Sequence, residues 1–158
     1  MPDHHDTTPS SAGILSLSDG LAHSARDLIL LLGRVSLGWI FMESGWRKLQ
    51  DIAGFAATMP RRGLPIYMGY IAPPVEFIGG LMVLGGIATR YAALMLLAFT
   101  IVASVSSHAF WSYPANDMAN RNLHYTHFWK NMSIKGGLIL LFVTAAGKFS
   151  IDALLRRK

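Results

Sequence analysis

The sequence contains no cysteine and only two glutamates. Without cysteine, the chain cannot form disulfides, thiol relays, thiolate-bound iron–sulfur clusters or thiolate zinc sites. Charged residues are also scarce, at 15% of the 158 residues, whereas 52% of the residues are hydrophobic. A soluble domain of this length needs a more polar surface, so the composition indicates a membrane protein.

The formal net charge is +5, which in a soluble protein would suit binding to nucleic acid. Here the basic residues flank long apolar stretches, a position in which they meet phospholipid headgroups. We therefore expect a lipid bilayer as the surrounding partner and no nucleic acid.

Four apolar stretches of about 20 residues follow one another along the chain. They cover about residues 28–46, 67–88, 91–111 and 128–147. Such a length crosses the hydrocarbon core as a helix, and lipid offers backbone groups no hydrogen-bond partners in any open structure. The prediction is an all-α fold, an integral membrane four-helix bundle. The short connection at Thr89-Arg90 makes the second and third spans antiparallel neighbours.

The predicted division of the chain is a flexible polar N-terminal tail, a transmembrane domain and a basic C-terminal tail. These parts cover residues 1–26, 27–155 and 148–158. The N-terminus lacks a basic n-region and a small-residue cleavage pattern, so the first apolar run is expected to stay as an anchor. Basic residues are nearly balanced between the two sides of the membrane, but the RRK end suits an anionic leaflet. We expect a multi-pass protein of a bacterial cytoplasmic (inner) membrane with both termini cytoplasmic.

Both glutamates, Glu43 and Glu76, fall within predicted spans. A charged side chain near the bilayer centre costs about 2.5 to 3.5 kcal/mol on insertion scales, so each is expected to face the bundle interior and to have a partner. Depths compared by helical rise pair Glu76 with Arg34 and Glu43 with Lys130. Lys135 is expected to reach either acid.

The helix that carries Glu76 is expected to pack closely against a neighbour, because small residues share the face of the acid. The positions on this face are Glu76, Gly79, Gly80 and Val83. Pro73 and Pro74 precede the acid by about one turn. They either kink the helix inside the membrane or open it at its first turn, and both alternatives place irregular backbone beside Glu76.

A polar rim is predicted where the fourth span begins. His127, Lys130 and Asn131 share one helical face, which His124 joins if the helix starts a turn earlier. With Glu43 they would form the mouth of the bundle. The surrounding aromatic residues, which also fit an ordinary interfacial belt, are Trp46, Trp111, Tyr113, Tyr125 and Trp129.

The histidines raise the alternative of a haem or metal site. His108 and His127 could oppose each other as axial haem ligands. No set with metal-ligand spacing accompanies them, so we predict no metal site, and His4-His5-Asp6 lies in the polar tail.

Several segments together resemble one family. These are GRVSLGWIFMESGWRKLQDIAGFAATMPRRGLP, VEFIGGLMVLGGIATRYAA and HFWKNMSIKGGLILL. In this order they are similar to the DoxX family of small bacterial four-helix membrane proteins, over about residues 28–154. The matching features are Gly45, Lys48 and Leu49, Gly63-Leu64-Pro65, Glu76 before Gly79-Gly80, Thr89-Arg90, His127, Lys130, Asn131 and Gly136-Gly137. Pro73-Pro74 and Arg34 depart from the pattern.

The resemblance implies a membrane location and, for some relatives, a link to quinone-dependent sulfur oxidation or to oxidoreductase complexes. Our first hypothesis is an accessory subunit of a quinone-linked redox system, with no intrinsic cofactor, a quinone as the candidate ligand and an oxidoreductase as the partner protein. The predicted pocket residues are Glu76, Arg34, Glu43, Lys130, His127, Asn131 and Lys135. The alternative is a non-catalytic assembly or scaffolding factor, which could also form a homo-oligomer. A transporter is less favoured, because four helices without repeated halves offer little machinery for alternating access.

Overall fold

The computed structural model describes residues 11–156, with side chains from residue 18 onward. This part of the chain is all-helical, which confirms the predicted class. Its helices are α1 (Ser11–Gln50), α2 (Ile52–Ala57), η1 (Pro60–Arg62), α3 (Met68–Gly85), α4 (Thr89–Ser107), η2 (Phe110–Ser112), α5 (Met118–Thr144) and α6 (Ile151–Leu155).

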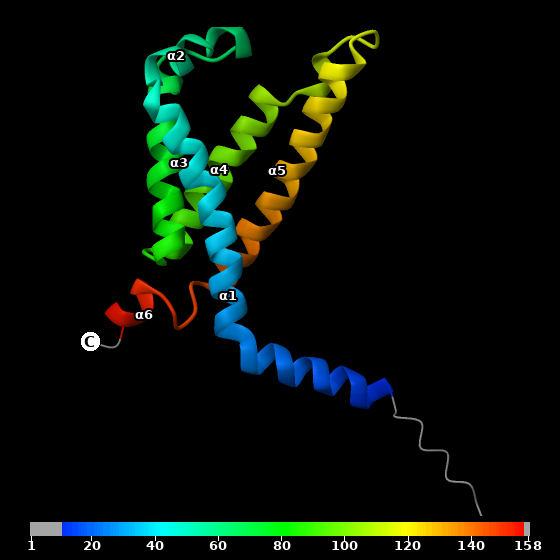
Figure 1. Ribbon diagram of the computed structural model, residues 1–158, viewed down its shortest axis with the longest axis vertical. Helices are drawn as coiled ribbons and strands as arrows, with labels where there is room; N and C mark the ends of the chain where they lie inside the picture. Colours follow the sequence, from blue (N-terminus) through cyan, green and yellow to red (C-terminus); the bar gives the residue numbers. More distant parts are fainter. Residues whose placement is uncertain (1–10, 157–158) are drawn as a thin grey trace, which may run out of the picture.

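The long helices form two pairs that are arranged as a V (Figure 1). α1 lies along α3, and α4 lies along α5. The pairs meet at the end of the molecule that holds the α3–α4 connection and α6, and they diverge toward the α2–η1 segment and η2. The N-terminal part of α1 and the C-terminal segment lie at the closed end of the V. Both described ends of the chain are therefore on one side of the molecule.

Glycines allow α1 and α3 to touch backbone to backbone. A Cβ atom added to Gly38 would lie 2.9 Å from the carbonyl oxygen of Gly80. One added to Gly45 would lie 2.5 Å from the backbone nitrogen of Phe77. Close approach of this kind is typical of helix packing in membranes, where small residues bring neighbouring backbones together. The prediction for the Glu76 face is confirmed, since Glu76, Gly79, Gly80 and Val83 are all buried.

The core between the helices is small, and the outside is strongly apolar. Leu96 and Leu138 are fully buried between α4 and α5. On the outside, Tyr91 is 78% exposed and Leu140 is 66% exposed. So much exposed apolar surface is unfavourable in water and suits contact with lipid tails.

Three helical segments are long and apolar enough to cross a membrane. They are Ser18–Gln50, Met68–Gly85 and Thr89–Ser112. A lipid bilayer is therefore the environment of this protein. α5 is long enough to cross, at 27 residues, but its charged residues lower its hydropathy below that of the other three. The structure thus confirms three of the four predicted spans.

Three boundaries differ from the predictions. The flexible tail predicted over residues 1–26 is wrong from Ser11 onward, because α1 begins there and no proline interrupts it before Gln50. The turn between the second and third spans is confirmed, but it lies just before Thr89, where Gly86 has a φ of 66° and Ala88 a φ of 44°. The predicted basic tail over residues 148–158 contains the short helix α6.

Pro73 and Pro74 do not open their helix, because α3 begins at Met68. Both lie inside the helix, where a proline has no N–H to donate to the carbonyl four residues earlier. The carbonyls of Gly69 and Tyr70 therefore lack the usual donor. Of the two alternatives, the interior position is the one that the structure shows.

Candidate functional site

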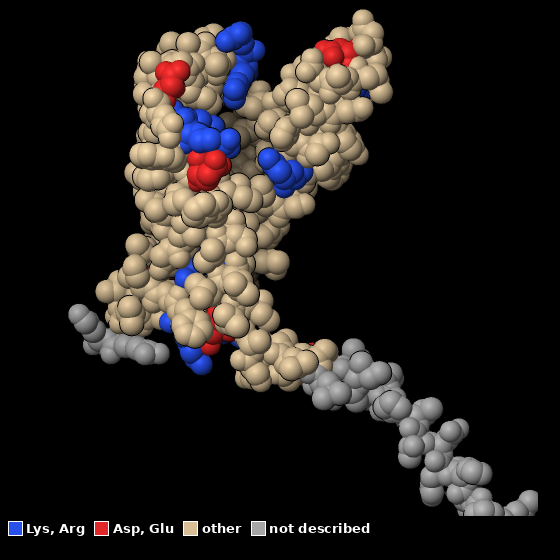
Figure 2. Space-filling view, viewed as in Figure 1, with Lys and Arg blue, Asp and Glu red and all other residues tan. Residues whose placement is uncertain are grey.

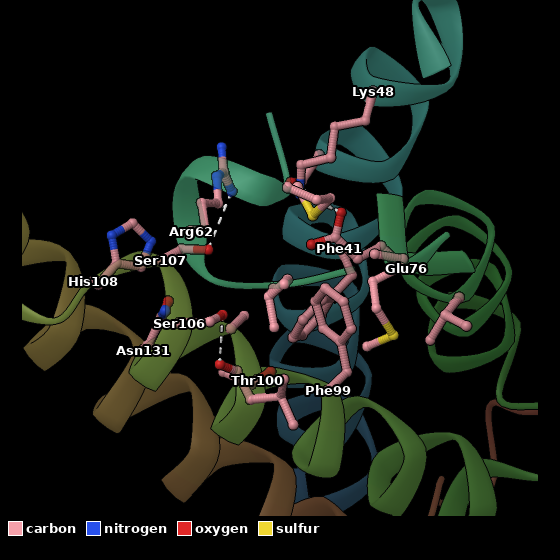
Figure 3. Close-up of a pocket in the computed structure, with 18 of the residues that line it drawn as sticks. Phe41, Lys48, Arg62, Glu76, Phe99, Thr100, Ser106, Ser107, His108 and Asn131 are labelled. Atoms are coloured by element: carbon pink, nitrogen blue, oxygen red, sulfur yellow. Dashed lines mark hydrogen bonds and ion pairs between the residues drawn. The ribbon is translucent and has the colours of Figure 1, made fainter. Parts of the chain in front are cut away.

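A cavity of about 850 Å³ occupies the space between the two arms of the V. The space-filling view shows this hollow, with basic side chains gathered around it (Figure 2). Its apolar lining includes Phe41 from α1 and Phe99 from α4. Its polar lining comes from all four long helices and from the α2–η1 segment, as the close-up shows (Figure 3). The polar residues of the lining are Ser44, Lys48, Arg61, Arg62, Glu76, Thr100, Ser106, Ser107, His108, Tyr113, His124, Lys130 and Asn131.

An ion pair between α1 and α3 forms one wall of the cavity. Nζ of Lys48 lies 2.5 Å from Oε2 of Glu76. The hydroxyl of Ser44 donates to the same carboxylate oxygen at 3.4 Å. The Glu76 side chain is only 7% exposed, whereas that of Lys48 is 27% exposed. The lysine therefore links a buried carboxylate to the more accessible part of the cavity.

The predicted pairing of Glu76 with Arg34 is wrong. The close contacts of Gly38 with Gly80 and of Gly45 with Phe77 fix the antiparallel register of α1 and α3. In this register Ser44 lies beside Glu76, and Arg34 is ten residues away along α1, about 15 Å at 1.5 Å per residue. Arg34 instead lies at the closed end of the V.

The second predicted pair is also wrong. Glu43 binds Arg47, four residues later on α1, with Nε 2.7 Å from Oε1, and both side chains are well exposed. Lys130 lies across the cavity on α5. Lys135 forms a salt bridge with neither glutamate, and its ammonium lies 5.5 Å from the centre of the Phe128 ring. The two acids are therefore in different surroundings, one inside the cavity and one outside it.

Histidines gather where α4 ends and α5 passes. The Nδ1 atoms of His108 and His124 are 3.3 Å apart, and the hydroxyl of Tyr113 lies 2.7 Å from Nε2 of His124. His127 stacks on His108 with ring centres 5.0 Å apart, and its Nδ1 lies 3.4 Å from Nζ of Lys130. The predicted polar face of the fourth helix is thus present. His108 and His127 stack on each other, which is not the arrangement of two axial ligands on opposite faces of a haem.

The mouth of the cavity is spanned by the segment that joins α1 to α3. Nη1 of Arg62, in η1, donates to the hydroxyl of Ser107 at the end of α4, at 3.1 Å. Two cations lie over the ring of Phe55, with Nζ of Lys48 at 5.3 Å and Cζ of Arg62 at 5.4 Å from its centre. One arm of the V is therefore tied to the other above the ion pair.

The structure brings together only part of the predicted site. Glu76, Lys130 and Asn131 line the cavity. His127 stacks on His108, which is a lining residue. Arg34, Glu43 and Lys135 lie elsewhere. Lys48 and Arg62 were not predicted as site residues, because both follow the end of the first apolar run.

A signal for Lys48 was present in the sequence, since this lysine is one of the residues that carry the resemblance given above. The described part of the chain contains no group of three or more histidine, aspartate or glutamate residues that could hold a metal ion. His4-His5-Asp6 lies outside the described residues.

Three apolar spans, an apolar exterior and a cavity with a buried ion pair define a small multi-pass helical membrane protein. The model of the DoxX family matches residues 29–109. Over 133 residues the chain is 33% identical to the inner membrane protein YqjF of Escherichia coli (strain K12), which covers 84% of this chain and 96% of YqjF. The chain belongs to the DoxX family.

Two further relatives extend the comparison. The inner membrane protein YphA of Escherichia coli (strain K12) is 30% identical over 131 residues, covering 82% of this chain and 91% of YphA. CatD of Bacillus subtilis (strain 168), which is provisionally named an oxidoreductase, is 37% identical over 75 residues, covering 48% of this chain and 55% of CatD. No solved structure matches the chain.

Proposed function

We propose that this DoxX-family protein is an accessory membrane subunit of a quinone-linked redox system and that the cavity beside Glu76 binds the quinone headgroup. The observation that carries the proposal is the combination of an apolar cavity and a buried, ion-paired carboxylate at membrane depth. Ionisable residues inside membranes are costly and are typically kept for a function. The cavity volume of about 850 Å³ is within the range of small-molecule sites.

The lining suits a quinone chemically. A quinone headgroup has a flat apolar ring and two carbonyl oxygens that accept hydrogen bonds. Phe41 and Phe99 offer aromatic surfaces to such a ring, and the ammonium of Lys48 and the amide of Asn131 offer donors to the oxygens. The cavity lies between membrane helices, which gives a lipophilic ligand a route from the bilayer.

A bound quinone would supply two-electron redox chemistry, in which two protons are taken up on reduction. Glu76 is suited to handle such a proton, because it is buried in the cavity wall and, among the described residues, its carboxylate bonds to Lys48 and Ser44. The chain has no cysteine for an iron–sulfur cluster, so we look outside it for the source of the electrons. We propose that a partner oxidoreductase supplies them, and the provisional name of CatD supports a redox link for proteins similar to this chain.

The proposed arrangement in the membrane is a four-helix bundle in which α5 is the fourth span. Ile134, Leu138 and Leu141 bury one face of α5, and its second half exposes Leu140 and Val143 to the surroundings. We place the protein in the cytoplasmic membrane, as the names of YqjF and YphA support, with both termini cytoplasmic. Two separate fusions to the C-terminus test on which side of the membrane it lies. A reporter enzyme that is active only in the periplasm should be inactive, and a fluorescent protein that folds in the cytoplasm should be fluorescent.

Photoaffinity labelling with an azido-quinone tests the ligand. The full chain in nanodiscs should be labelled on cavity residues, and excess unlabelled quinone should suppress the label. Glu76→Gln should reduce saturable labelling, and Ala103→Phe should reduce it by filling the cavity without a change in charge. Glu43→Gln is the matched control, because this acid lies outside the cavity and should leave labelling unchanged. Labelling that free quinone does not suppress would reject the quinone site.

An assembly or scaffolding factor is the second candidate, and an exposed aromatic group favours it. Trp111, Tyr125 and Trp129 lie together near the start of α5, and each is about half exposed. Exposed aromatic side chains are common anchors of protein interfaces. A photocrosslinker at position 129 should then capture one membrane protein in the native membrane. Capture of the same protein by the Glu76→Gln variant, without bound quinone, would favour this candidate over the first.

A further inference from the structure

A second hollow, of about 380 Å³, lies at the closed end of the V. It is formed where α1, the start of α4, the end of α5 and the C-terminal segment meet. α1 and α4 each contribute one cation, and the C-terminal segment that follows α5 contributes two. The four are Arg26, Arg90, Lys148 and Arg156.

The two carboxylates at this hollow are already bonded within the protein. Asp152 accepts the backbone N–H of Ala88 at 2.7 Å, and it accepts both the N–H and the hydroxyl of Thr89 at 2.9 and 2.8 Å. Asp27 accepts the backbone N–H of Lys148 at 3.0 Å and pairs with its ammonium at 3.3 Å. Neither carboxylate forms a salt bridge with an arginine of the hollow within the described residues.

Arg34 adds a fifth positive charge directly behind the lining. It is only 2% exposed, and it donates to the carbonyl oxygens of Ala146 at 3.0 Å and Phe149 at 2.6 Å. Its Nε atom is buried without a hydrogen-bond partner, and no carboxylate in the described part of the chain forms a salt bridge with it. Five cations therefore surround two carboxylates, Asp27 and Asp152. The excess of positive charge favours the binding of an anion.

The position of the hollow indicates which anion is available. The α3–α4 connection joins two membrane spans, so this end of the molecule lies at the boundary between hydrocarbon and water. The phosphates of lipid headgroups occupy that level. Arginine is well suited to them, because its planar guanidinium can donate two parallel hydrogen bonds to phosphate oxygens.

We propose that this hollow binds a phosphate group, supplied by the headgroup of an anionic phospholipid. Arg90 from the start of α4 and Arg156 from the C-terminal segment hold the phosphate, and Arg26 closes the site from α1. The buried Arg34 adds its charge from behind. This site is separate from the quinone cavity, which lies between the open arms of the V.

Native mass spectrometry of the full chain in detergent tests the proposal. Phosphatidylglycerol should bind more tightly than the zwitterionic phosphatidylcholine. The variant Arg90→Gln/Arg156→Gln should weaken phosphatidylglycerol binding about 25-fold, at about fivefold for each cation removed. Arg90→Lys/Arg156→Lys should keep most of the affinity. The control Arg47→Gln/Arg121→Gln removes the same charge at the other end of the molecule and should bind as the wild type does.

Inorganic phosphate is the second arm of the experiment. Its competition with phosphatidylglycerol would support a phosphate site, and its binding without any preference for phosphatidylglycerol would assign the site to a soluble phosphate. Equal binding of both lipids by the wild type, without binding of inorganic phosphate, would overturn the proposal. Equal losses in the Arg90/Arg156 variant and in the control would overturn it as well.

Discussion

Lys48 and Glu76 are 28 residues apart in the sequence, and their side chains form an ion pair of 2.5 Å between α1 and α3. The pair is unequal, because the carboxylate is almost completely buried and the lysine is partly accessible. The two residues should therefore differ in what their loss does to the protein.

Lys48→Met should destabilise the protein by about 3 kcal/mol, because it leaves a buried carboxylate without its cation. Glu76→Gln should cost about 1 kcal/mol, since the remaining lysine can turn toward water. The double variant should be close to Glu76→Gln alone. Reversible unfolding in mixed micelles measures these free energies, with Glu43→Gln as the control. A smaller loss for Lys48→Met than for Glu76→Gln would contradict the assignment.

Gly80→Ala tests the contact between α1 and α3. A Cβ atom at this position would collide with the backbone nitrogen of Met42, so we expect a loss of about 1 to 3 kcal/mol. Gly136→Ala on α5 is the matched control, because nothing lies within 4 Å of its added Cβ atom. The control should be neutral or slightly stabilising, since alanine favours helix more than glycine does. Equal losses at the two positions would show that the close packing is not responsible.

Arg62→Ala tests the tie across the mouth of the cavity. Loss of its hydrogen bond to Ser107 should increase hydrogen–deuterium exchange in α2 and η1 about fivefold, the effect of about 1 kcal/mol. The neighbouring Arg61→Ala is the control, because Arg61 has no hydrogen bond or ion pair with any described residue. Exchange that rises equally in both variants would point to a general effect of charge.

Asp152 should make stability depend on pH. Burial raises the pKa of its carboxyl group, but the hydrogen bonds from Thr89 and Ala88 outweigh burial and hold the pKa below its ordinary value of 3.8. Because the pKa is lowered in the folded state, the stabilisation is complete above that ordinary value and is lost as the pH falls through the folded pKa.

The variant Asp152→Asn should therefore be less stable than the wild type at neutral pH. The difference in unfolding free energy should shrink as the pH is lowered below about 4. The unfolding free energies of both proteins are measured over this pH range in the same detergent. Their difference reports the effect of Asp152, because the other carboxyl groups are common to both proteins. A difference that stays constant down to about pH 2 would contradict the prediction.

The sequence was sufficient for the helical class, for the burial of Glu76 and for the glycine face that contacts α1. These features follow from local composition and from helical spacing. The partner of Glu76 could not be predicted in the same way, because the depth comparison assumed that the helices end at one level. α1 continues to Gln50, and the close contact of Gly38 with Gly80 sets an offset that no single segment reveals.

The cavity was also only partly predictable. Its α5 face followed from the spacing of Lys130 and Asn131 in one helix. Its other walls depend on the angle between two helix pairs and on a tie between Arg62 and Ser107, which are 45 residues apart. Such long-range geometry leaves no periodic pattern in the chain.

The contacts of Arg34 have a consequence for biosynthesis. Its acceptors, Ala146 and Phe149, follow it by 112 and 115 residues. While the ribosome is still making the middle of the chain, the first span must hold an arginine whose final partners do not yet exist. Arg34 therefore acquires its two acceptors only after the C-terminal segment has emerged, so its final hydrogen bonds are among the last contacts that the chain can form.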